Sequence, residues 1–346
     1  MKPKEFITLD KIPLTEVDAD NRFFSATASE IEQGLTSDIY FVRSRDLLSS
    51  MGLADTVVTA EIFSSGDGII TGVNEVLHLL RGRGLEIWAL PEGELMSTKE
   101  AVMRIRGRYS DFGIYETPLL GMLASSSGWS TAAGSCKKAA SERTVICYGA
   151  RHLHPAVAPV MERAAVIGGA DACSCILGAL LLDRVPVGTI PHAAFLIVGD
   201  SVELAKAYDR FVPEDAPRII LVDTFKDETE EALRVADALG RQLSGIRLDT
   251  PGERGGVTPA LVREVRARLD QKGFGHVQIV VSGGLTPERI GMLAEAGADA
   301  FGVGSFISRA PAIDMTLDLK EVRGEAVAKR GRVPGITENK RLVKMS

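Results

Sequence analysis

The feature that most constrains the fold is a series of short β-branched runs that alternate with helical patterns from about residue 144 onward. The runs lie at residues 145–148, 172–175, 187–189, 218–222, 245–248, 277–281 and 300–303. The later runs end roughly 20 to 35 residues apart, which is the size of a βαβ unit. We therefore expect a parallel sheet with helices packed on it, in an α/β barrel that is complete or partly open.

The helical patterns between these runs carry recognisable ends. Residues 224–240 have one apolar face, and Gly240 can end that helix. Thr286 and Pro287 can begin another helix, with the threonine as its cap and the proline in its first turn. Residues 114–140 are rich in small side chains and helical in period, with Lys137 and Lys138 near the end.

The first part of the chain, up to about residue 125, has a different pattern. Residues 56–63, 85–90 and 101–105 read as strands, and residues 73–80 read as a helix. These patterns predict a separate α+β unit with a short, largely antiparallel sheet. The basic tail from residue 325 onward either packs back on this unit or frays.

Composition excludes several classes of protein. With 40 Lys and Arg against 46 Asp and Glu, the net charge is −6, and aromatic residues make up only 5% of the 346 residues. Both values argue against a nucleic-acid partner. No run approaches the roughly 20 apolar residues of a membrane helix, so we expect no membrane contact. The four cysteines show no zinc spacing, which predicts no metal site and a reducing, cytoplasmic location.

Two consecutive predicted strands end in glycine. Ser282, Gly283 and Gly284 follow one, and Gly302, Gly304 and Ser305 follow the next. Glycine lets backbone N–H groups approach an anion closely, and a helix N-terminus favours negative charge. Because many barrels bind phosphate after their last two strands, this pattern predicts a phosphate site.

Charged side chains follow the two preceding strands. Arg247 and Asp249 stand two residues apart, so both can reach one pocket, and Asp223 ends the strand before. Carboxylates there could hold a ribose diol or Mg²⁺, and the arginine could hold a phosphate or carboxylate. The competing interpretation is an internal ion pair.

Two further groups stand at predicted strand ends. Tyr148, Arg151 and His152 suit a flat anionic ring, because the aromatic can stack on it and the arginine can pair with its carboxylate. Thr189 and His192 follow another predicted strand. His192 could be a general base or accept a phosphoryl group, or it could be a structural histidine.

Taken together, these residues resemble nicotinate phosphoribosyltransferase, especially its shorter archaeal type. The similarity extends over nearly the whole chain, in the stretches SDIYF at 37–41, YGARHLHPAVAPVMERAAVIGGADACSCILGALLL at 148–182, VPVGTIPHA at 185–193, RIILVDTFKDETEEAL at 218–233, GIRLDTPGERGG at 245–256, VSGGL at 281–285, FGVGSFIS at 301–308 and AVAKRGR at 326–332.

The resemblance implies a type II phosphoribosyltransferase fold. Residues 1–125, completed by residues 311–346, would form an α/β sandwich, and residues 126–310 would form a partly open α/β barrel. The implied reaction joins nicotinate to phosphoribosyl pyrophosphate and gives nicotinate mononucleotide and pyrophosphate. Coupled ATP hydrolysis, Mg²⁺ held with the pyrophosphate or ATP, and a homodimer or homohexamer whose subunits share active sites are also implied.

The family's residue roles carry over to matching positions. Tyr148 would stack on the pyridine ring, Arg151 would lie near its carboxylate, and Tyr40 would be lent by a neighbouring subunit. Arg247, Asp249 and Asp223 would hold pyrophosphate and ribose, and His192 would be phosphorylated by ATP. The 5′-phosphate would lie on the glycine loops, with Ser282 and Ser305 beside them. His152, Thr189, Lys137 and Lys138 complete the candidate substrate-binding residues.

The chain departs from the family pattern at two points. It has no cysteine after Cys175, so the zinc cluster of some archaeal-type members is not expected, and Thr-Ile-Pro-His replaces the bacterial Thr-Met-Ala-His. Three rival functions stay open. A quinolinate phosphoribosyltransferase shares the fold but would need extra basic residues and an Arg-Lys-Thr run. A nicotinamide phosphoribosyltransferase and a non-catalytic phosphate-binding barrel are the second and third.

Overall fold

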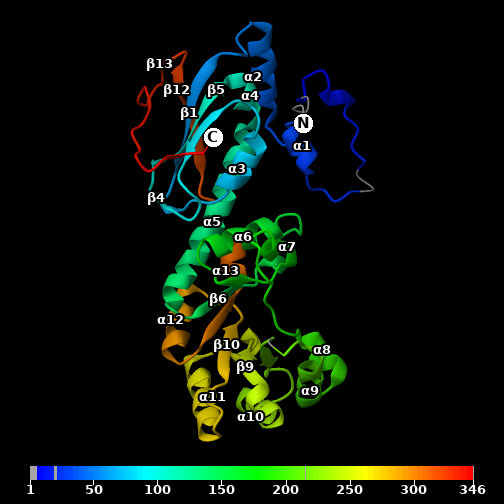
Figure 1. The fold of residues 1–346 in the computed structure, drawn as a ribbon. Helices are drawn as coiled ribbons and strands as arrows, with labels where there is room; N and C mark the ends of the chain where they lie inside the picture. The colour runs from blue at the N-terminus through cyan, green and yellow to red at the C-terminus, as the bar shows by residue number, and fades with distance from the viewer. Residues whose placement is uncertain (1–5, 19–21, 215, 346) are drawn as a thin grey trace. The chain divides into compact units, whose positions relative to one another are not determined.

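The computed structural model describes residues 6–18, 22–214 and 216–345 (Figure 1). Contacts within the chain divide it into two units, Met1–Ser130 with Pro311–Ser346, and Thr131–Ala310. The expected boundary between residues 125 and 126 falls inside helix α5 (Glu116–Ala140), a single helix that belongs to both units.

The first unit is built on an antiparallel sheet in the order β13-β12-β1-β5-β3-β14. Its strands are β1 (Val57–Ser64), β3 (Glu86–Ala89), β5 (Ala101–Arg108), β12 (Met315–Val322), β13 (Glu325–Ala326) and β14 (Val343–Lys344), and a small second sheet pairs β2 (Gly68–Ile69) with β4 (Leu95–Met96). Its helical segments are η1 (Ile12–Leu14), α1 (Ala28–Glu32), α2 (Ile39–Ser50), α3 (Val73–Leu80), α4 (Tyr109–Phe112), η2 (Gly113–Tyr115) and the first part of α5.

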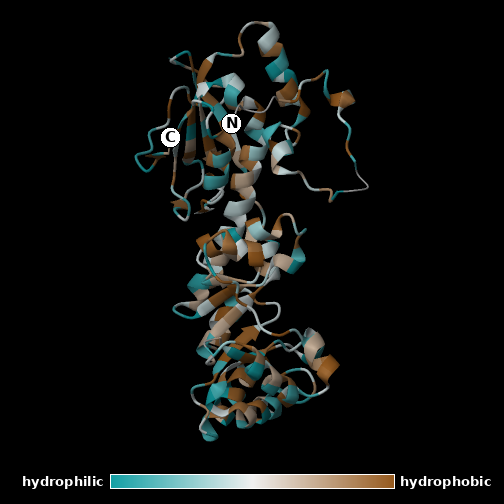
Figure 2. Cartoon of the chain, turned by 45° about the vertical axis from the view of Figure 1, so that its right-hand side comes forward, coloured by the Kyte–Doolittle hydropathy of each residue, from teal (hydrophilic) through white to brown (hydrophobic). Residues whose placement is uncertain are grey.

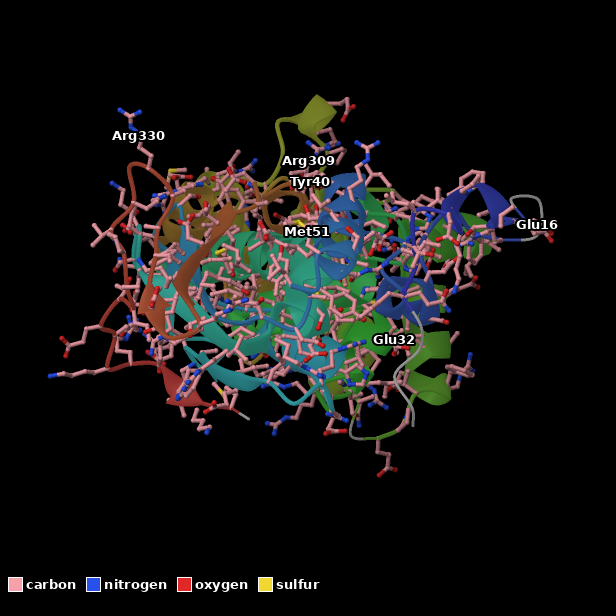
Figure 3. The ribbon with its side chains drawn as sticks, turned by 90° about the horizontal axis from the view of Figure 1, so that it is seen from above. Glu16, Glu32, Tyr40, Met51, Arg309 and Arg330 are labelled. Carbon is pink, nitrogen blue, oxygen red and sulfur yellow. The ribbon has the colours of Figure 1, made fainter. Side chains whose placement is uncertain are left out.

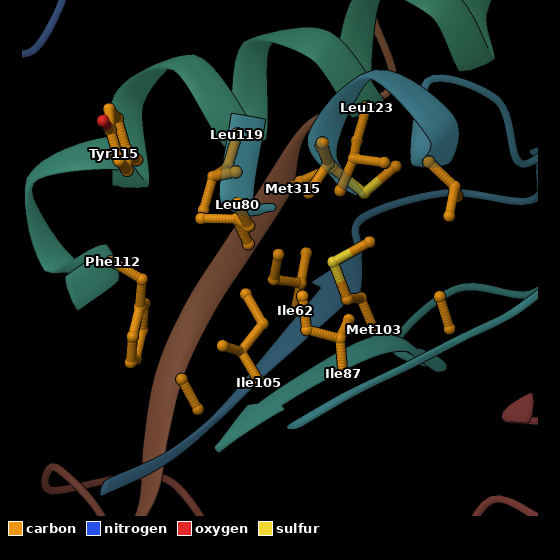
Figure 4. Packing of buried hydrophobic residues seen from close by; sticks show 14 of the residues in the cluster. Ile62, Leu80, Ile87, Met103, Ile105, Phe112, Tyr115, Leu119, Leu123 and Met315 are labelled. Carbon is orange, nitrogen blue, oxygen red and sulfur yellow. The ribbon is translucent and has the colours of Figure 1, made fainter. Parts of the chain in front are cut away.

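The core of this unit lies between the sheet and its helices (Figure 4). Side chains of a strand point alternately to the two faces of the sheet, so one face collects apolar side chains. The core face presents Ile62, Ile87, Met103 and Ile105, and the helices contribute Leu80, Leu119 and Leu123.

The C-terminal segment covers the other face of the sheet through polar contacts. Glu61 on β1 is fully buried and accepts a hydrogen bond of 2.8 Å from Arg104 Nε on β5. The N–H of Thr337 donates to the same carboxylate at 3.1 Å, and Arg104 Nη2 donates to the Thr337 carbonyl at 2.7 Å. This buried ion pair therefore ties the tail to the sheet, with β14 extending the sheet beside β3.

The second unit is built on six parallel strands in the order β7-β6-β11-β10-β9-β8, which form an open half-barrel (Figure 1). The strands are β6 (Thr144–Cys147), β7 (Ala172–Cys173), β8 (Arg218–Leu221), β9 (Leu243–Leu248), β10 (Gln278–Ser282) and β11 (Ala300–Val303). The helices are α6 (Ala158–Ile167), α7 (Ile176–Leu180), α8 (His192–Val198), α9 (Ser201–Phe211), α10 (Glu228–Leu239), α11 (Pro259–Gln271), α12 (Pro287–Glu295) and α13 (Ser305–Ser308), with short 3-10 turns η3 (Ala150–His152), η4 (Gly240–Gln242) and η5 (Gly252–Arg254).

The predicted fold class is confirmed: an N-terminal α/β unit with its own sheet and a partly open parallel α/β barrel. Two element predictions are wrong. Residues 187–189 form a loop, in which the N–H of Val187 donates to the carbonyl of Cys173 at the end of β7 at 2.9 Å. The helix expected from residue 224 begins at Glu228, where the Asp227 side chain caps it by accepting from Thr229 N.

Many of the hydrophobic residues of both units are buried in their cores (Figure 2). An exception is α8, where Leu196, Ile197 and Val198 are exposed at 64%, 85% and 42%. Within the described residues, no helix combines the length and apolar character needed to cross a membrane.

The buried ion pair under the tail gives a stability prediction. Glu61→Ala should lower the free energy of unfolding by about 3 to 5 kcal/mol, because it leaves a largely buried Arg104 without its partner. Glu86→Ala is the matched control on β3, since Glu86 is 47% exposed and its ion pairs lie at the surface; it should cost about 0 to 1 kcal/mol. The free energies of unfolding are measured by denaturant titration followed by the fluorescence of Trp88 and Trp129, both in the first unit. Equal losses of stability in the two variants would contradict the prediction.

Candidate functional site

The polar residues predicted at strand ends gather at one edge of the half-barrel. In a parallel sheet all carboxyl ends meet at the same edge, which is where α/β proteins place their sites. Tyr148 directly follows β6, Asp249 directly follows β9, and Asp223 lies two residues past β8. Gly283 directly follows β10, and Gly304 directly follows β11. The order of the strands places the β9, β10, β11 and β6 ends side by side.

Arg247 on β9 is the centre of the hydrogen-bond network at this edge. Its Nε donates to Ser282 Oγ at 2.8 Å, its Nη1 to Thr189 Oγ1 at 2.8 Å, and its Nη2 to Asp249 Oδ2 at 3.3 Å. The guanidinium carbon also lies 5.1 Å from the centre of the Tyr148 ring. The structure therefore gathers four other predicted site residues around this one cation.

Asp249 is held on both carboxylate oxygens. Ser282 Oγ donates to Oδ1 at 2.7 Å, while Arg247 contacts Oδ2. Gly283 comes close to the same carboxylate, since a Cβ built there would lie 3.2 Å from Asp249 Oδ1, and its φ of +91° is left-handed. A side chain at position 283 would therefore be strained and would press on Asp249.

Two aromatic rings lie over glycines at the end of β11. A Cβ on Gly302 would lie 2.5 Å from Tyr148 Cε2, and a Cβ on Gly304 would lie 3.0 Å from His152 Nε2. Burial raises the pKa of the Tyr148 hydroxyl, and the neighbouring Arg247 opposes that rise. Glycine is needed at both positions because the rings occupy the space that a Cβ atom would fill. Ser305, the next predicted residue, is the first residue of α13.

Asp223 and His192 form a pair at the β8 end of the edge. His192 Nε2 lies 3.1 Å from Asp223 Oδ2, and the aspartate side chain is 1% exposed. Its other oxygen, Oδ1, is buried and has no hydrogen-bond partner among the described residues. Burial raises the pKa of the Asp223 carboxyl, His192 lowers it, and Asp249 raises it further. A buried acceptor without a donor can take a ligand hydroxyl or a cation.

The glycine loop after β10 is braced by an arginine that sequence reasoning missed. Arg289 on α12 donates to the Gly284 carbonyl at 3.3 Å and to the Val257 carbonyl at 3.1 Å, which joins the loops after β10 and β9. Gly284 has a left-handed φ of +57°, and Thr286 caps α12 as predicted. The signal was present, since an arginine three residues past a helix cap can reach back to the preceding loop.

Four predicted site residues do not join this network. Lys137 binds Asp171 at 2.9 Å and the Arg143 carbonyl, at the edge where β6 and β7 begin, so the structure does not bring it to the site. Lys138 lies on the same helix, near its end. Arg151 is exposed in η3, beside His152. Tyr40 lies on α2 of the first unit and is 54% exposed (Figure 3), and its contribution to a partner stays a prediction.

Sequence reasoning also missed a buried carboxylate behind the site. Glu162 on α6 has no exposed surface and accepts hydrogen bonds from the loops that follow β6 and β7. It stands on a helix of mainly apolar and small residues, so the pattern reads only as a buried helix face. No group of three His, Cys, Asp or Glu side chains arranged to hold a metal ion occurs within residues 6–18, 22–214 and 216–345.

Comparison with known families places both units. The family "Quinolinate phosphoribosyl transferase, N-terminal domain" matches residues 38–127, and "Quinolinate phosphoribosyl transferase, C-terminal domain" matches residues 130–318. A crystal structure of nicotinate-nucleotide pyrophosphorylase from Pyrococcus furiosus is 44% identical, with a TM-score of 0.87, over 91% of this chain and 82% of that one.

Two curated relatives differ in how much of their length is matched. A nicotinate phosphoribosyltransferase of Mycobacterium tuberculosis is 35% identical over 73% of this chain, but the match spans only 57% of its own length. A probable nicotinate-nucleotide pyrophosphorylase (carboxylating) of Methanothermobacter thermautotrophicus is 24% identical over 78% of this chain and 90% of its own length.

These findings correct the expected activity. The resemblance implied a nicotinate phosphoribosyltransferase, whereas the matching families, the 44% identical structure and the archaeal relative carry quinolinate phosphoribosyltransferase or nicotinate-nucleotide pyrophosphorylase names. The expectation of a nicotinate enzyme is therefore wrong, while that of a phosphoribosyltransferase holds. The motifs that carried the resemblance therefore do not identify the acceptor. The chain belongs to the quinolinate phosphoribosyl transferase family.

Proposed function

We propose that this protein transfers the phosphoribosyl group of phosphoribosyl pyrophosphate to quinolinate. The ring nitrogen bonds to C1 of ribose, and the bond from C1 to pyrophosphate breaks. With the nitrogen positively charged, the 2-carboxyl group leaves as CO₂, and the electron pair left on that ring carbon takes a proton. The products are nicotinate mononucleotide, pyrophosphate and CO₂. Family membership supports this reaction, as does the 44% identical structure, which is that of a nicotinate-nucleotide pyrophosphorylase.

The observation that carries the phosphoribosyl-transfer part of the proposal is the network around Arg247, whereas the choice of quinolinate as the acceptor rests on the family and the 44% identical structure. One fixed cation, two carboxylates and two glycine loops lie at one sheet edge, which suits a sugar that bears phosphate at one end and pyrophosphate at the other. In this proposal Arg247 faces the pyrophosphate, and the loops that follow β10 at Gly283 and β11 at Gly304 take the 5′-phosphate.

The chemistry asks for charge stabilisation rather than a strong nucleophile. Loss of pyrophosphate gives C1 of ribose cationic character, which nearby carboxylates stabilise. In this proposal Asp223, whose Oδ1 is buried and without a partner among the described residues, and Asp249 take this role. Mg²⁺, when bound by these carboxylates and the pyrophosphate, would neutralise the leaving group; one or two carboxylates plus phosphate oxygens is a common magnesium environment.

Quinolinate has two carboxylates, and the chain lacks the Arg-Lys-Thr run expected for the second one. In this proposal Arg151 supplies the charge instead, and His152 contributes a ring nitrogen beside it. They belong to one short turn, η3, and His152 already lies against the end of β11. Arg151 is exposed and so is accessible to a ligand.

A direct assay tests the acceptor. Purified protein with Mg²⁺ and phosphoribosyl pyrophosphate should form nicotinate mononucleotide from quinolinate and release one CO₂ for each nucleotide. Nicotinate and nicotinamide are offered in parallel, each with and without ATP, because coupling to ATP through His192 stays an untested prediction. Turnover of nicotinate without turnover of quinolinate would overturn the proposal, and no turnover with any acceptor would favour a binding role.

Replacing one carboxylate tests the ribose side. Asp249→Asn keeps the shape of the side chain but removes the charge that faces Arg247 and the developing cation, so kcat should fall about 100-fold. Circular dichroism and the thermal midpoint should stay close to those of the unchanged protein. Glu264→Gln, on the exposed face of α11, is a control that should leave turnover unchanged. Unchanged kinetics in Asp249→Asn would reject the assigned role.

A methyl group tests the close approach at β11. Gly302→Ala puts a Cβ within 2.6 Å of two Tyr148 ring atoms, so the ring must move. We expect kcat/KM to fall about 10- to 100-fold, since small displacements of a binding group are costly. Gly291→Ala on α12 is the matched control, because a Cβ there has no described atom within 4 Å. Equal activity in the two variants would show that Tyr148 does not need its present position.

A further inference from the structure

Glu162 occupies an unusual place in the second unit. It lies on α6, is fully buried, and sits behind the loops that carry part of the candidate site. Its carboxylate accepts from the N–H of Ala150 at 3.0 Å and from the hydroxyl of Ser174 at 3.1 Å, and the N–H of Cys175 donates to its other oxygen. A buried carboxylate is tolerated only when donors of this kind satisfy it.

The donors come from two different loops. Ala150 is the first residue of η3, which follows β6 and contains Arg151 and His152. Ser174 and Cys175 directly follow β7, and Cys175 precedes α7. Glu162 therefore links the ends of two neighbouring strands through its side chain, just beyond the last residue pair of β6 and β7 and next to the hydrogen bond from the N–H of Ser174 to the Cys147 carbonyl.

The hydrogen bonds of Glu162 affect the part of the site that contains Arg151 and His152, and not the part around Arg247. Fixing Ala150 fixes the turn that places the His152 ring against Gly304 and presents Arg151. The groups that would hold ribose and pyrophosphate are instead connected to one another, through the hydrogen bonds of Arg247, Ser282 and Asp249.

We propose that Glu162 is a positioning residue for the pyridine acid. Its charge holds the η3 turn so that Arg151 and His152 are ready to meet the carboxylates of the acceptor. This inference rests on the proposed function for the identity of the acceptor. The structural part, that Glu162 fixes the loops after β6 and β7, holds independently of that function.

Steady-state kinetics of Glu162→Gln test the role. An amide offers one acceptor oxygen where the carboxylate offers two, so one loop loses its bond and the turn loosens. We expect KM for quinolinate to rise about tenfold, with kcat and KM for phosphoribosyl pyrophosphate changed less than about twofold. The matched control is Glu231→Gln, since Glu231 is equally buried on α10 but pairs with Arg234 at 2.8 Å. Equal rises in both KM values, or the same profile in the control, would overturn the proposal.

A second variant and a measurement without turnover also test the role of Glu162. Ser174→Ala removes one donor and leaves the carboxylate, so it should raise KM for quinolinate in the same direction by about two- to threefold even where Glu162→Gln folds poorly. Hydrogen exchange followed by mass spectrometry needs no turnover. Glu162→Gln should speed exchange in peptides covering residues 148–154 and 173–177 and leave residues 281–286 unchanged. A wild-type protein inactive on quinolinate would reject the proposed function, whereas unchanged exchange in those peptides would reject the role of Glu162.

Discussion

The rest of the site depends on the hydrogen bonds that the guanidinium of Arg247 donates. It reaches Thr189 on a loop, Ser282 on β10 and Asp249 directly after its own strand, and it lies over the ring of Tyr148. An arginine suits this place because its planar donors keep fixed directions, so each bond constrains the others. Its position on β9, next to β10 in the sheet, lets one cation collect groups from the neighbouring strand and from the loop at residue 189.

Close backbone approach is the second constraint. The rings of Tyr148 and His152 stand where side chains on Gly302 and Gly304 would be, and Asp249 stands beside Gly283. Gly283 and Gly284, on the loop after β10, also have left-handed φ angles of +91° and +57°. Close packing of protein groups and a left-handed backbone therefore explain why glycine recurs at this edge.

The sequence could predict those parts of the site that depend on local order along the chain. Arg247, Asp249, Ser282 and the glycines stand at strand ends, and the parallel topology brings strand ends together, so their meeting followed from the βαβ pattern. Lys137 could not be placed this way, because its partner Asp171 lies at the opposite edge and helical period does not say which edge a helix end approaches. The pattern at residues 187–189 predicts a strand because Val187 and Thr189 are β-branched, although a proline stands directly before them. Glu162 was missed because its partners are mainly backbone N–H groups, which leave no pattern in the sequence.

The acceptor was misjudged for a related reason. In the proposed function the motifs that suggested the family hold ribose and phosphate, and among them Arg247, Asp249 and Ser282 are joined by hydrogen bonds. Arg151 and His152 lie instead on a short turn that Glu162 contacts at Ala150 and that packs against Gly304. Neither side chain belongs to the hydrogen-bond network of Arg247, so the turn can differ between relatives while that network stays the same. Members of one fold can therefore keep the same donor site and differ in the pyridine acid they take, and the discriminating residues are expected on the turn rather than in the motifs that first suggest the family.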